Sequence, residues 1–426
     1  MLTPRPTQGD TDWFMRDRFG MFIHWGLYAL PARHEWVQSR EEIAPEDYRV
    51  YFERFNPVCY DPRHWARLAR EAGMKYAVLT TKHHEGFCLW DSAFTDYKVT
   101  QTPWGKDLLQ PFVEAFRAEG LRIGFYHSLL DWHHPDFPID IFHPLRNHPQ
   151  AAELNAGRDV RRYAEYLRNQ VRELLTGYGP VDILWLDYSY PGREYKGLPG
   201  KGRADWESEK LLALVRELCP RIMINNRLDL PVAADFYTPE QVQPLEWVKV
   251  DGHPVVWEAC QTFSGSWGYH RDESTWKSPE QLIQMLVNTV SIGGNLLMNV
   301  GPAALGSIDP RAVRALETYR DWMALHGESI YGCTQSEFSA PRDCRLTQKG
   351  GKVYVHVFAW PFKLLILPGM AGKVSYARFL HDGSQVTLDA SAWEHRQVDL
   401  PPSALVLSLP VRKPDVVVPV IELTLK

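Results

Sequence analysis

The sequence predicts an α/β fold: a (β/α)8-like barrel over residues 1–332, followed by a C-terminal β-sandwich over residues 333–426. Between about residues 18 and 330, short β-branched or aromatic runs alternate with longer runs of helical period, as in repeated βα units. No GxGxxG or phosphate-loop motif follows an early strand, which disfavours an open doubly wound sheet. Near residue 333 the helical period stops, and short strands follow roughly every ten residues, which is typical of a β-sandwich.

Seven strands are predicted for the barrel, each a short apolar run rich in β-branched or aromatic residues. The predicted strands span residues 18–26, 75–84, 121–128, 181–189, 221–227, 253–262 and 294–302. Seven strands with intervening helices over about 310 residues fit a (β/α)8-type barrel with irregular or missing elements.

Six helices are predicted between and after these strands. In the helix at 62–73, Trp65, Leu68 and Ala69 share one face, and Gly73 stands where a helix commonly ends. The helix at 107–120 ends at Gly120 in the same way. The other helices are expected at 159–179, 208–219, 278–294 and 309–327.

The C-terminal region reads as short strands separated by turn signals such as Pro368-Gly369 and Asp382-Gly383. The predicted strands span residues 352–360, 363–368, 373–380, 384–390, 404–409 and 415–426. Few polar aromatic residues cluster here, so we expect this region to act as a structural cap on the barrel.

The composition of the 426 residues is that of a folded globule, with 45% hydrophobic and 23% charged residues. A net charge of −5 without a basic patch predicts no nucleic-acid partner. No run of 18 apolar residues occurs, so no membrane partner is expected, and a start without signal-peptide features predicts a cytoplasmic protein. The six cysteines lie far apart without a CxxC pair and are expected to be mostly buried thiols. No oligomeric state is predicted.

Polar residues at the carboxyl ends of the strands are the first candidates for a site, because barrels carry their active sites there. In the strand at 181–189, the period of two places Ile183, Trp185 and Asp187 on the inward face, with Leu184 and Leu186 facing outward under helices. A carboxylate in that position either caps a helix or faces a polar cavity. Trp185 on the same face favours the cavity.

Four other strands also end in hydrogen-bonding groups. These are His24, the His83-His84 pair, Tyr126 with His127, and the Asn225 to Arg227 run. No HxH closes the first strand and no HExxH occurs, so we expect no metal and no cofactor, and no GxSxG motif marks a serine nucleophile. A site of histidines, an arginine and tryptophans around carboxylates suits a neutral sugar, whose hydroxyls accept directional hydrogen bonds and whose apolar faces stack on indoles.

Several segments resemble the α-L-fucosidases of glycoside hydrolase family 29. The matching segments span residues 13–37, 55–92, 124–137, 182–188, 266–273 and 291–308, nearly the whole barrel. The combination of KHHEGF with GGNLLMNVGP is highly specific. The resemblance implies a catalytic (β/α)8-like barrel with a C-terminal β-sandwich. It also implies a retaining exo-glycosidase that releases terminal L-fucose from fucosylated oligosaccharides or glycoconjugates without a metal or organic cofactor.

The resemblance also implies roles for individual residues. Asp187 in LWLDY matches the nucleophile of the family, and Trp267 falls where the family places an aromatic residue against the methyl group of the sugar. The fucose-binding positions match His24, Glu35, Trp36, His83, His84, Tyr126, Trp185 and Arg227. Arg227 and histidine donors would keep Asp187 ionised.

Three carboxylates compete for the role of acid/base. Glu240 in DFYTPE resembles the position seen in bacterial members and is favoured. Glu258 in VVWEAC is the rival, but it lies within an apolar run that reads as a strand, which suggests a structural carboxylate. Glu35 is the third.

Two other functions stay open at the level of sequence. One is a retaining barrel glycosidase that acts on another 6-deoxy or galacto-configured sugar. The other is a catalytically inactive sugar-binding barrel in which Asp187 serves as a hydrogen-bond acceptor.

Overall fold

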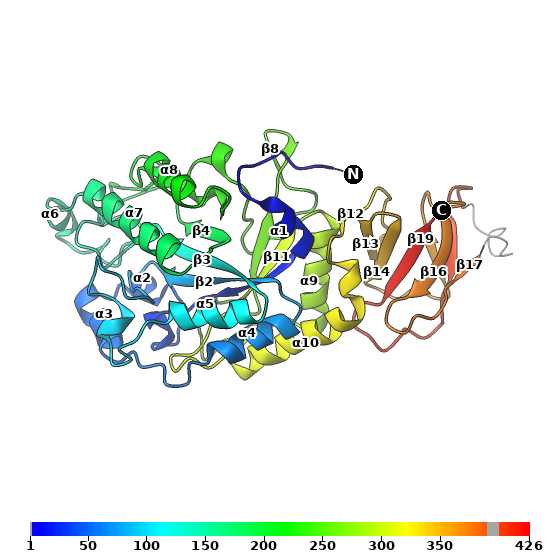
Figure 1. Ribbon diagram of the computed structural model, residues 1–426, viewed down its shortest axis with the longest axis horizontal. Helices are drawn as coiled ribbons and strands as arrows, with labels where there is room; N and C mark the ends of the chain where they lie inside the picture. Colours follow the sequence, from blue (N-terminus) through cyan, green and yellow to red (C-terminus); the bar gives the residue numbers. More distant parts are fainter. Residues whose placement is uncertain (1, 390–399) are drawn as a thin grey trace.

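The computed structural model describes residues 2–389 and 400–426, in which a helix-covered parallel sheet adjoins a smaller group of antiparallel strands (Figure 1). The parallel sheet and its helices precede the antiparallel strands along the chain, as the sequence predicts. Among the described residues, no helix has both the length and the apolar character needed to cross a membrane.

Seven parallel strands form the curled sheet at the centre of the barrel, in the spatial order β10-β11-β1-β2-β3-β4-β7. They are β1 (Phe19–Ile23), β2 (Tyr76–Lys82), β3 (Arg122–Ser128), β4 (Ile183–Asp187), β7 (Met223–Ile224), β10 (Glu258–Thr262) and β11 (Asn295–Val300). Each lies within a predicted strand. The predicted strand at 253–262 is only half right, because His253–Pro254 (β9) pairs instead with Lys249–Val250 (β8) in a separate hairpin.

An irregular segment, residues 236–240, joins the two edges of this sheet. Phe236 bridges to Asn225 beyond β7, while Tyr237 and Glu240 bridge to Trp257 and Cys260 beside and within β10. All three bridges are parallel, and the amide of Tyr237 donates to the carbonyl of Val256 at 2.9 Å. The segment therefore occupies the gap between β7 and β10 and is the irregular element that the strand count implies.

Six helices cover the sheet at the predicted places: α4 (Pro62–Glu71), α5 (Leu109–Ala118), α7 (Val160–Gly177), α8 (Ser208–Leu218), α9 (Pro279–Ser291) and α10 (Pro310–His326). The start of α9 is fixed by a capping box, in which Ser278 and Gln281 satisfy each other's backbone amides. Gly73 follows α4 with a φ of 85°, a conformation that favours glycine. Four helices were not predicted: α1 (Thr11–Asp17), α2 (Val37–Arg40), α3 (Pro45–Phe52) and α6 (Ala151–Asn155).

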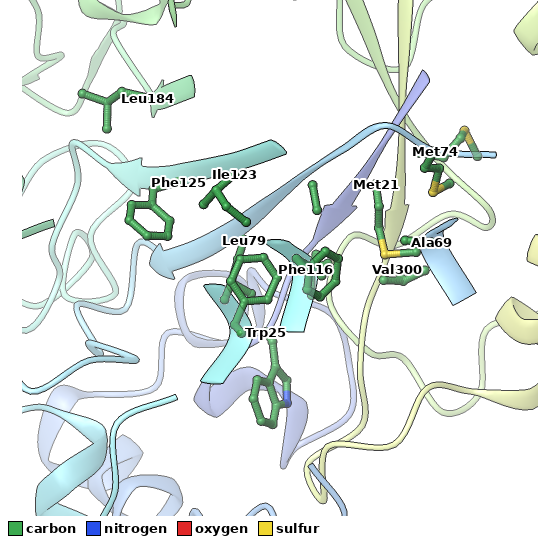
Figure 2. Packing of buried hydrophobic residues seen from close by; sticks show 14 of the residues in the cluster. Met21, Trp25, Ala69, Met74, Leu79, Phe116, Ile123, Phe125, Leu184 and Val300 are labelled. Carbon is green, nitrogen blue, oxygen red and sulfur yellow. The ribbon is translucent and has the colours of Figure 1, made fainter. Parts of the chain in front are cut away.

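The two faces of β4 are buried in different environments, as the period of two predicts. Leu184 and Leu186 belong to the large cluster between sheet and helices. Figure 2 shows Leu184 with other residues of this cluster, including Phe125 of the adjacent strand β3. Ile183 and Trp185 instead belong to the cluster inside the barrel. Asp187 follows on this inward face, at the end of the strand.

The C-terminal strands form two antiparallel sheets, and one core cluster draws its residues from both. The first sheet has the order β12-β13-β14-β19-β16, from β12 (Thr334–Gln335), β13 (Cys344–Lys349), β14 (Lys352–Val357), β19 (Val420–Leu425) and β16 (Val374–Phe379). The second has the order β15-β18-β17, from β15 (Leu364–Leu367), β18 (Leu405–Ser408) and β17 (Thr387–Asp389). Strands β12 and β13 were not predicted, and residue 390 of the predicted strand 384–390 lies outside the described residues.

The sandwich packs directly on the barrel, beside α9 and α10 (Figure 1). The indole of Trp322 in α10 donates to the carbonyl of Val418 at 3.2 Å, and the hydroxyl of Thr347 in β13 donates to the carbonyl of Ser329 at 2.7 Å. Four of the six cysteines are buried and all six are free thiols, as the sequence predicts.

Candidate active site

A cavity of about 330 Å³ opens at the carboxyl ends of the barrel strands. Parallel barrels carry their active sites at this end, because the loops that follow the strands meet there. All eleven candidate site residues line the cavity: His24, Glu35, Trp36, His83, His84, Tyr126, Trp185, Asp187, Arg227, Glu240 and Trp267. They come from loops and strand ends far apart in the sequence.

Asp187, the last residue of β4, is held from two sides. The hydroxyl of Tyr126 donates to its Oδ2 atom at 2.8 Å, and Nη1 of Arg227 donates to its Oδ1 atom at 3.3 Å. Nε2 of His84 lies 3.9 Å from Oδ2. The residue is 8% exposed, so its carboxylate faces the cavity from an otherwise buried position.

Glu240 lies at the end of the irregular segment 236–240 and is more open to solvent than Asp187. Its side chain is 40% exposed, against 12% for Asp187. Nη2 of Arg227 donates to its Oε2 atom at 2.9 Å. One guanidinium therefore bridges a buried and a more exposed carboxylate.

Arg227 is itself fixed in place. Its Nε atom donates to the hydroxyl of Thr238 at 2.9 Å and its Nη2 atom donates to the Thr238 carbonyl at 3.1 Å. Its guanidinium lies over the ring of Trp185, 5.3 Å from the ring centroid. These contacts orient the charge toward both carboxylates at once.

Glu258 lies outside this cavity, inside the barrel beneath Trp185. Its carboxylate is fully buried and accepts hydrogen bonds from the Tyr76 hydroxyl at 2.5 Å and the Trp185 indole at 3.2 Å. Burial raises its pKa to about 7. Glu258 therefore supports the floor of the site and does not line it.

The three histidines of the cavity are neutral at physiological pH. Burial lowers the pKa of His24 to about 3 and holds the pKa values of His83 and His84 well below their usual range. Nδ1 of His24 lies 2.6 Å from Oδ1 of Asn299, and Nδ1 of His84 lies 2.7 Å from the Ser128 hydroxyl. Neutral imidazoles can each donate one hydrogen bond and accept another, which suits sugar hydroxyls.

Arg227 and the histidines were expected together to keep Asp187 ionised, but the structure differs in the part played by the histidines. Burial raises the pKa of Asp187 to about 6, whereas Arg227 and the Tyr126 hydroxyl lower it. Because the histidines are neutral, they add no positive charge, and Arg227 is the cation that opposes burial. Asp187 is still largely ionised at pH 7.

Glu35 connects two parts of the cavity wall. Its Oε2 atom accepts hydrogen bonds from the backbone amides of Trp267 at 3.2 Å and Gly268 at 2.8 Å. The ring of Trp267 lies 5.1 Å from that of His24, and its carbonyl accepts from Asn299 at 2.6 Å. Glu35 thereby fixes the loop that presents Trp267 to the cavity.

Six residues that line the cavity were not singled out in the sequence: Phe22, Tyr188, Ser189, Tyr190, Arg193 and Cys260. Tyr188 has a φ of 81°, an uncommon conformation for a bulky residue, directly after Asp187. Its ring packs against those of Trp36 and His84 at centroid distances of 5.2 and 5.0 Å. Residues 188–193 directly follow the LWLD motif, and this position was the signal that could have identified Tyr188, Ser189, Tyr190 and Arg193 as cavity-lining residues.

Among residues 2–389 and 400–426, no three His, Cys, Asp or Glu side chains are grouped so that they could hold a metal ion.

Comparisons with known proteins agree on one family. The family model described as alpha-L-fucosidase matches residues 5–328. The chain is 31% identical to the human plasma alpha-L-fucosidase over 388 residues, which cover 82% of this chain and 76% of that protein.

Solved structures resemble the chain over nearly its whole length. Alpha-L-fucosidase isoenzyme 1 from Paenibacillus thiaminolyticus is 46% identical with a TM-score of 0.91, and the match covers 98% of each chain. A GH29 alpha-L-fucosidase from Bacteroides thetaiotaomicron, trapped as a covalent intermediate with 2-fluoro-fucosyl fluoride, is 29% identical with a TM-score of 0.83. That match covers 100% of this chain and 98% of the other.

Proposed function

The chain belongs to the α-L-fucosidase family, and on that premise we propose that Asp187 and Glu240 are the nucleophile and the acid/base of its reaction. The protein is a retaining glycoside hydrolase that acts on α-L-fucosides. A retaining mechanism needs two carboxylates in one site, of which one attacks and the other transfers protons. The observation that carries the assignment is the Arg227 bridge, which places Asp187 and Glu240 on one guanidinium in the cavity.

The different surroundings of the two carboxylates support their different roles. Tyr126 and Arg227 fix the side chain of Asp187, which points into the barrel from the end of β4. Its attacking oxygen is therefore held in one place. Glu240 is the more exposed of the two, at a position that water and a leaving group can reach. Glu258, the rival acid, is fully buried beneath Trp185, where no glycosidic oxygen could approach it.

The reaction runs in two steps with an oxocarbenium-like transition state before each product. In the first step an oxygen of Asp187 bonds to the anomeric carbon while the glycosidic C–O bond breaks, and Glu240 gives its proton to the leaving oxygen. In the second step Glu240 takes a proton from water, and the water oxygen displaces Asp187 from the anomeric carbon. The enzyme returns to its starting protonation state, and fucose leaves with retained configuration.

The remaining wall of the cavity is proposed to bind the fucose unit. The neutral imidazoles of His24, His83 and His84 are suited to exchange hydrogen bonds with hydroxyl groups without adding charge. Trp267 offers an apolar ring to the methyl group of the sugar, and Glu35 holds the loop that carries it. The substrates we propose are fucosylated oligosaccharides or glycoconjugates.

Trapping the covalent intermediate tests the assignment directly. We expect 2-fluoro-fucosyl fluoride to lose its anomeric fluoride, to inactivate the enzyme and to leave one 2-fluoro-fucosyl group on the peptide that contains Asp187, detected by mass spectrometry after digestion. Asp182, which precedes β4 at the other end of the barrel, lies close to Asp187 in the sequence, so fragmentation of the peptide must separate the two. A label on any residue other than Asp187 would refute the proposed nucleophile.

A further inference from the structure

A second, more open groove continues from the active-site cavity. It has a volume of about 720 Å³ and shares Arg193 with the cavity. Phe142 and Arg146 line one side of the groove, and Arg193 to Tyr195 line the other. The ring of Phe142 packs edge-on against that of Tyr188, 5.1 Å away, so the groove also adjoins the wall of the cavity at this point.

The two sides of the groove are tied together by hydrogen bonds. Oδ1 of Asn147 accepts from the Tyr195 hydroxyl at 3.0 Å and from Nζ of Lys196 at 2.8 Å, across the opening. Nδ2 of Asn147 donates to Glu42 at 2.5 Å. The 194–199 hairpin, formed by β5 (Glu194–Tyr195) and β6 (Leu198–Pro199), is therefore pinned in place without any ligand.

Arg193 has a free guanidinium where cavity and groove meet. Its backbone is fixed, because its amide donates to Tyr190 and its carbonyl accepts from Gly200. Its side chain is exposed and makes no hydrogen bond or ion pair with the described residues. By contrast, Arg146 in the groove is engaged by the Ser39 carbonyl at 2.8 Å and by Glu42 at 3.2 Å.

The groove adjoins the same cavity that holds Glu240, because Arg193 lines both. Glu240 and Arg193 line the same cavity, and Tyr188 lies close enough to both for their charges to shift its pKa in opposite directions. A leaving group protonated by Glu240 and too large for the cavity extends out of it, and Arg193 lies where the cavity meets the groove.

We propose that this groove binds the leaving saccharide of the substrate, that it takes a neutral oligosaccharide, and that Arg193 donates hydrogen bonds to the first sugar beyond fucose. The inference rests on the proposed function. The two arginines and two glutamates that line the groove sum to no net charge, and Lys196 at the opening is held by Asn147. Phe142 and Ile141 supply apolar surface for the faces of sugar rings.

The test compares substrates that do and do not reach the groove. We would measure kcat and KM on fucosyl fluoride, whose leaving group is a single ion, and on a neutral fucosylated tetrasaccharide with and without a terminal sialic acid. The variants are Arg193→Gln, which removes the proposed donor, and Tyr195→Phe, which removes one bond to Asn147. Arg203→Gln is the matched control, because Arg203 is exposed and lines neither the cavity nor the groove.

We expect Arg193→Gln to lower the ratio of kcat/KM on the neutral tetrasaccharide to kcat/KM on the fluoride about tenfold, mainly through KM. Tyr195→Phe should lower the ratio less, and Arg203→Gln should leave it unchanged. If Arg193→Gln lost kcat/KM equally on both substrates, or on neither, the proposal that the groove binds the leaving saccharide would be overturned. A higher kcat/KM of the wild type on the sialylated tetrasaccharide than on the neutral one would overturn the proposal that the groove takes a neutral oligosaccharide. Failure of the wild type to turn over fucosyl fluoride would instead refute the proposed function.

Discussion

Nη1 of Arg227 lies 3.3 Å from Oδ1 of Asp187, while the other terminal nitrogen of the same guanidinium binds Glu240. The contact opposes a large effect of burial, which raises the pKa of Asp187 to about 6. The proposed nucleophile, Asp187, must be ionised to attack, so we expect the charge of Arg227 to extend catalysis to lower pH.

Replacing Arg227 should shift the pH dependence of catalysis. In the wild type, kcat/KM should fall as the pH drops below about 6, because Asp187 becomes protonated. Arg227→Gln removes the cation that lowers the pKa of Asp187. The acidic limb of the kcat/KM profile should therefore shift to higher pH by about 1 pH unit or more. Arg227→Lys keeps the charge and should move the limb less. A pH profile on fucosyl fluoride measures both shifts, and an unmoved limb in Arg227→Gln would contradict this account.

Asp187→Ala should lower kcat about 1,000-fold or more while leaving the fold intact, because it removes the covalent route and no core packing. Added azide should restore turnover by entering the vacated space, and its product should be the fucosyl azide of inverted configuration. Product NMR and circular dichroism provide the measurements. Asp182→Ala, at the opposite end of the barrel, is the control and should not respond to azide. Near-normal hydrolysis by Asp187→Ala would exclude it as the nucleophile.

Glu240→Ala should lose most activity on substrates with poor leaving groups, by about 100-fold or more, because only these need protonation of the leaving oxygen. A dinitrophenyl fucoside or fucosyl fluoride should react nearly as before in the first step. Azide should accelerate the variant and give the fucosyl azide of retained configuration, since it attacks the fucosyl-enzyme from the face that Glu240 occupied. If Glu258→Gln showed this leaving-group dependence and Glu240→Ala did not, the two roles would have to be exchanged.

Glu258 should make stability depend on pH near neutrality. Its pKa is about 7 in the folded protein against 4.5 as the ordinary value. Because the folded pKa is raised, its contribution to stability is fully present below about pH 4.5 and is lost as the pH rises through 7. The free energy of unfolding of the wild type should therefore fall relative to that of Glu258→Gln by roughly 3 kcal/mol between pH 4.5 and 8. Parallel urea titrations of both proteins across this range would contradict the assignment if the difference stayed constant.

Strand geometry explains why much of the site could be predicted from sequence. Side chains alternate along a strand, so Trp185 and Asp187 had to share a face, and Leu184 the opposite one. The structure has this arrangement, with Trp185 inside the barrel and Leu184 under the helices. The ends of parallel strands meet at one end of a barrel, so His24 and His83 could be expected near Asp187 even though they are distant in the chain.

The sequence favoured Glu240 over Glu258, but it did not show where either carboxylate lies. Glu240 lies in a segment with Pro239 and no period of two, and this segment is held between β7 and β10 by isolated bridges that only the closed barrel supplies. Glu258 stands in an ordinary strand pattern, which does not reveal whether its carboxylate reaches the cavity or the core. Its position beneath Trp185 depends on Tyr76, which comes from another strand.

The sequence by itself determined the order of the seven barrel strands and of the six helices that cover them, the family and the residues that gather at the strand ends, because these follow from local periodicity and short motifs. Only the tertiary structure decided which of the site residues are charged and which of them form ion pairs. The bridge from Arg227 to both carboxylates, the neutral histidines, and the groove beside Arg193 all depend on burial and on contacts between distant segments. Desolvation and Coulomb interactions depend on distances in space, which a sequence pattern does not contain.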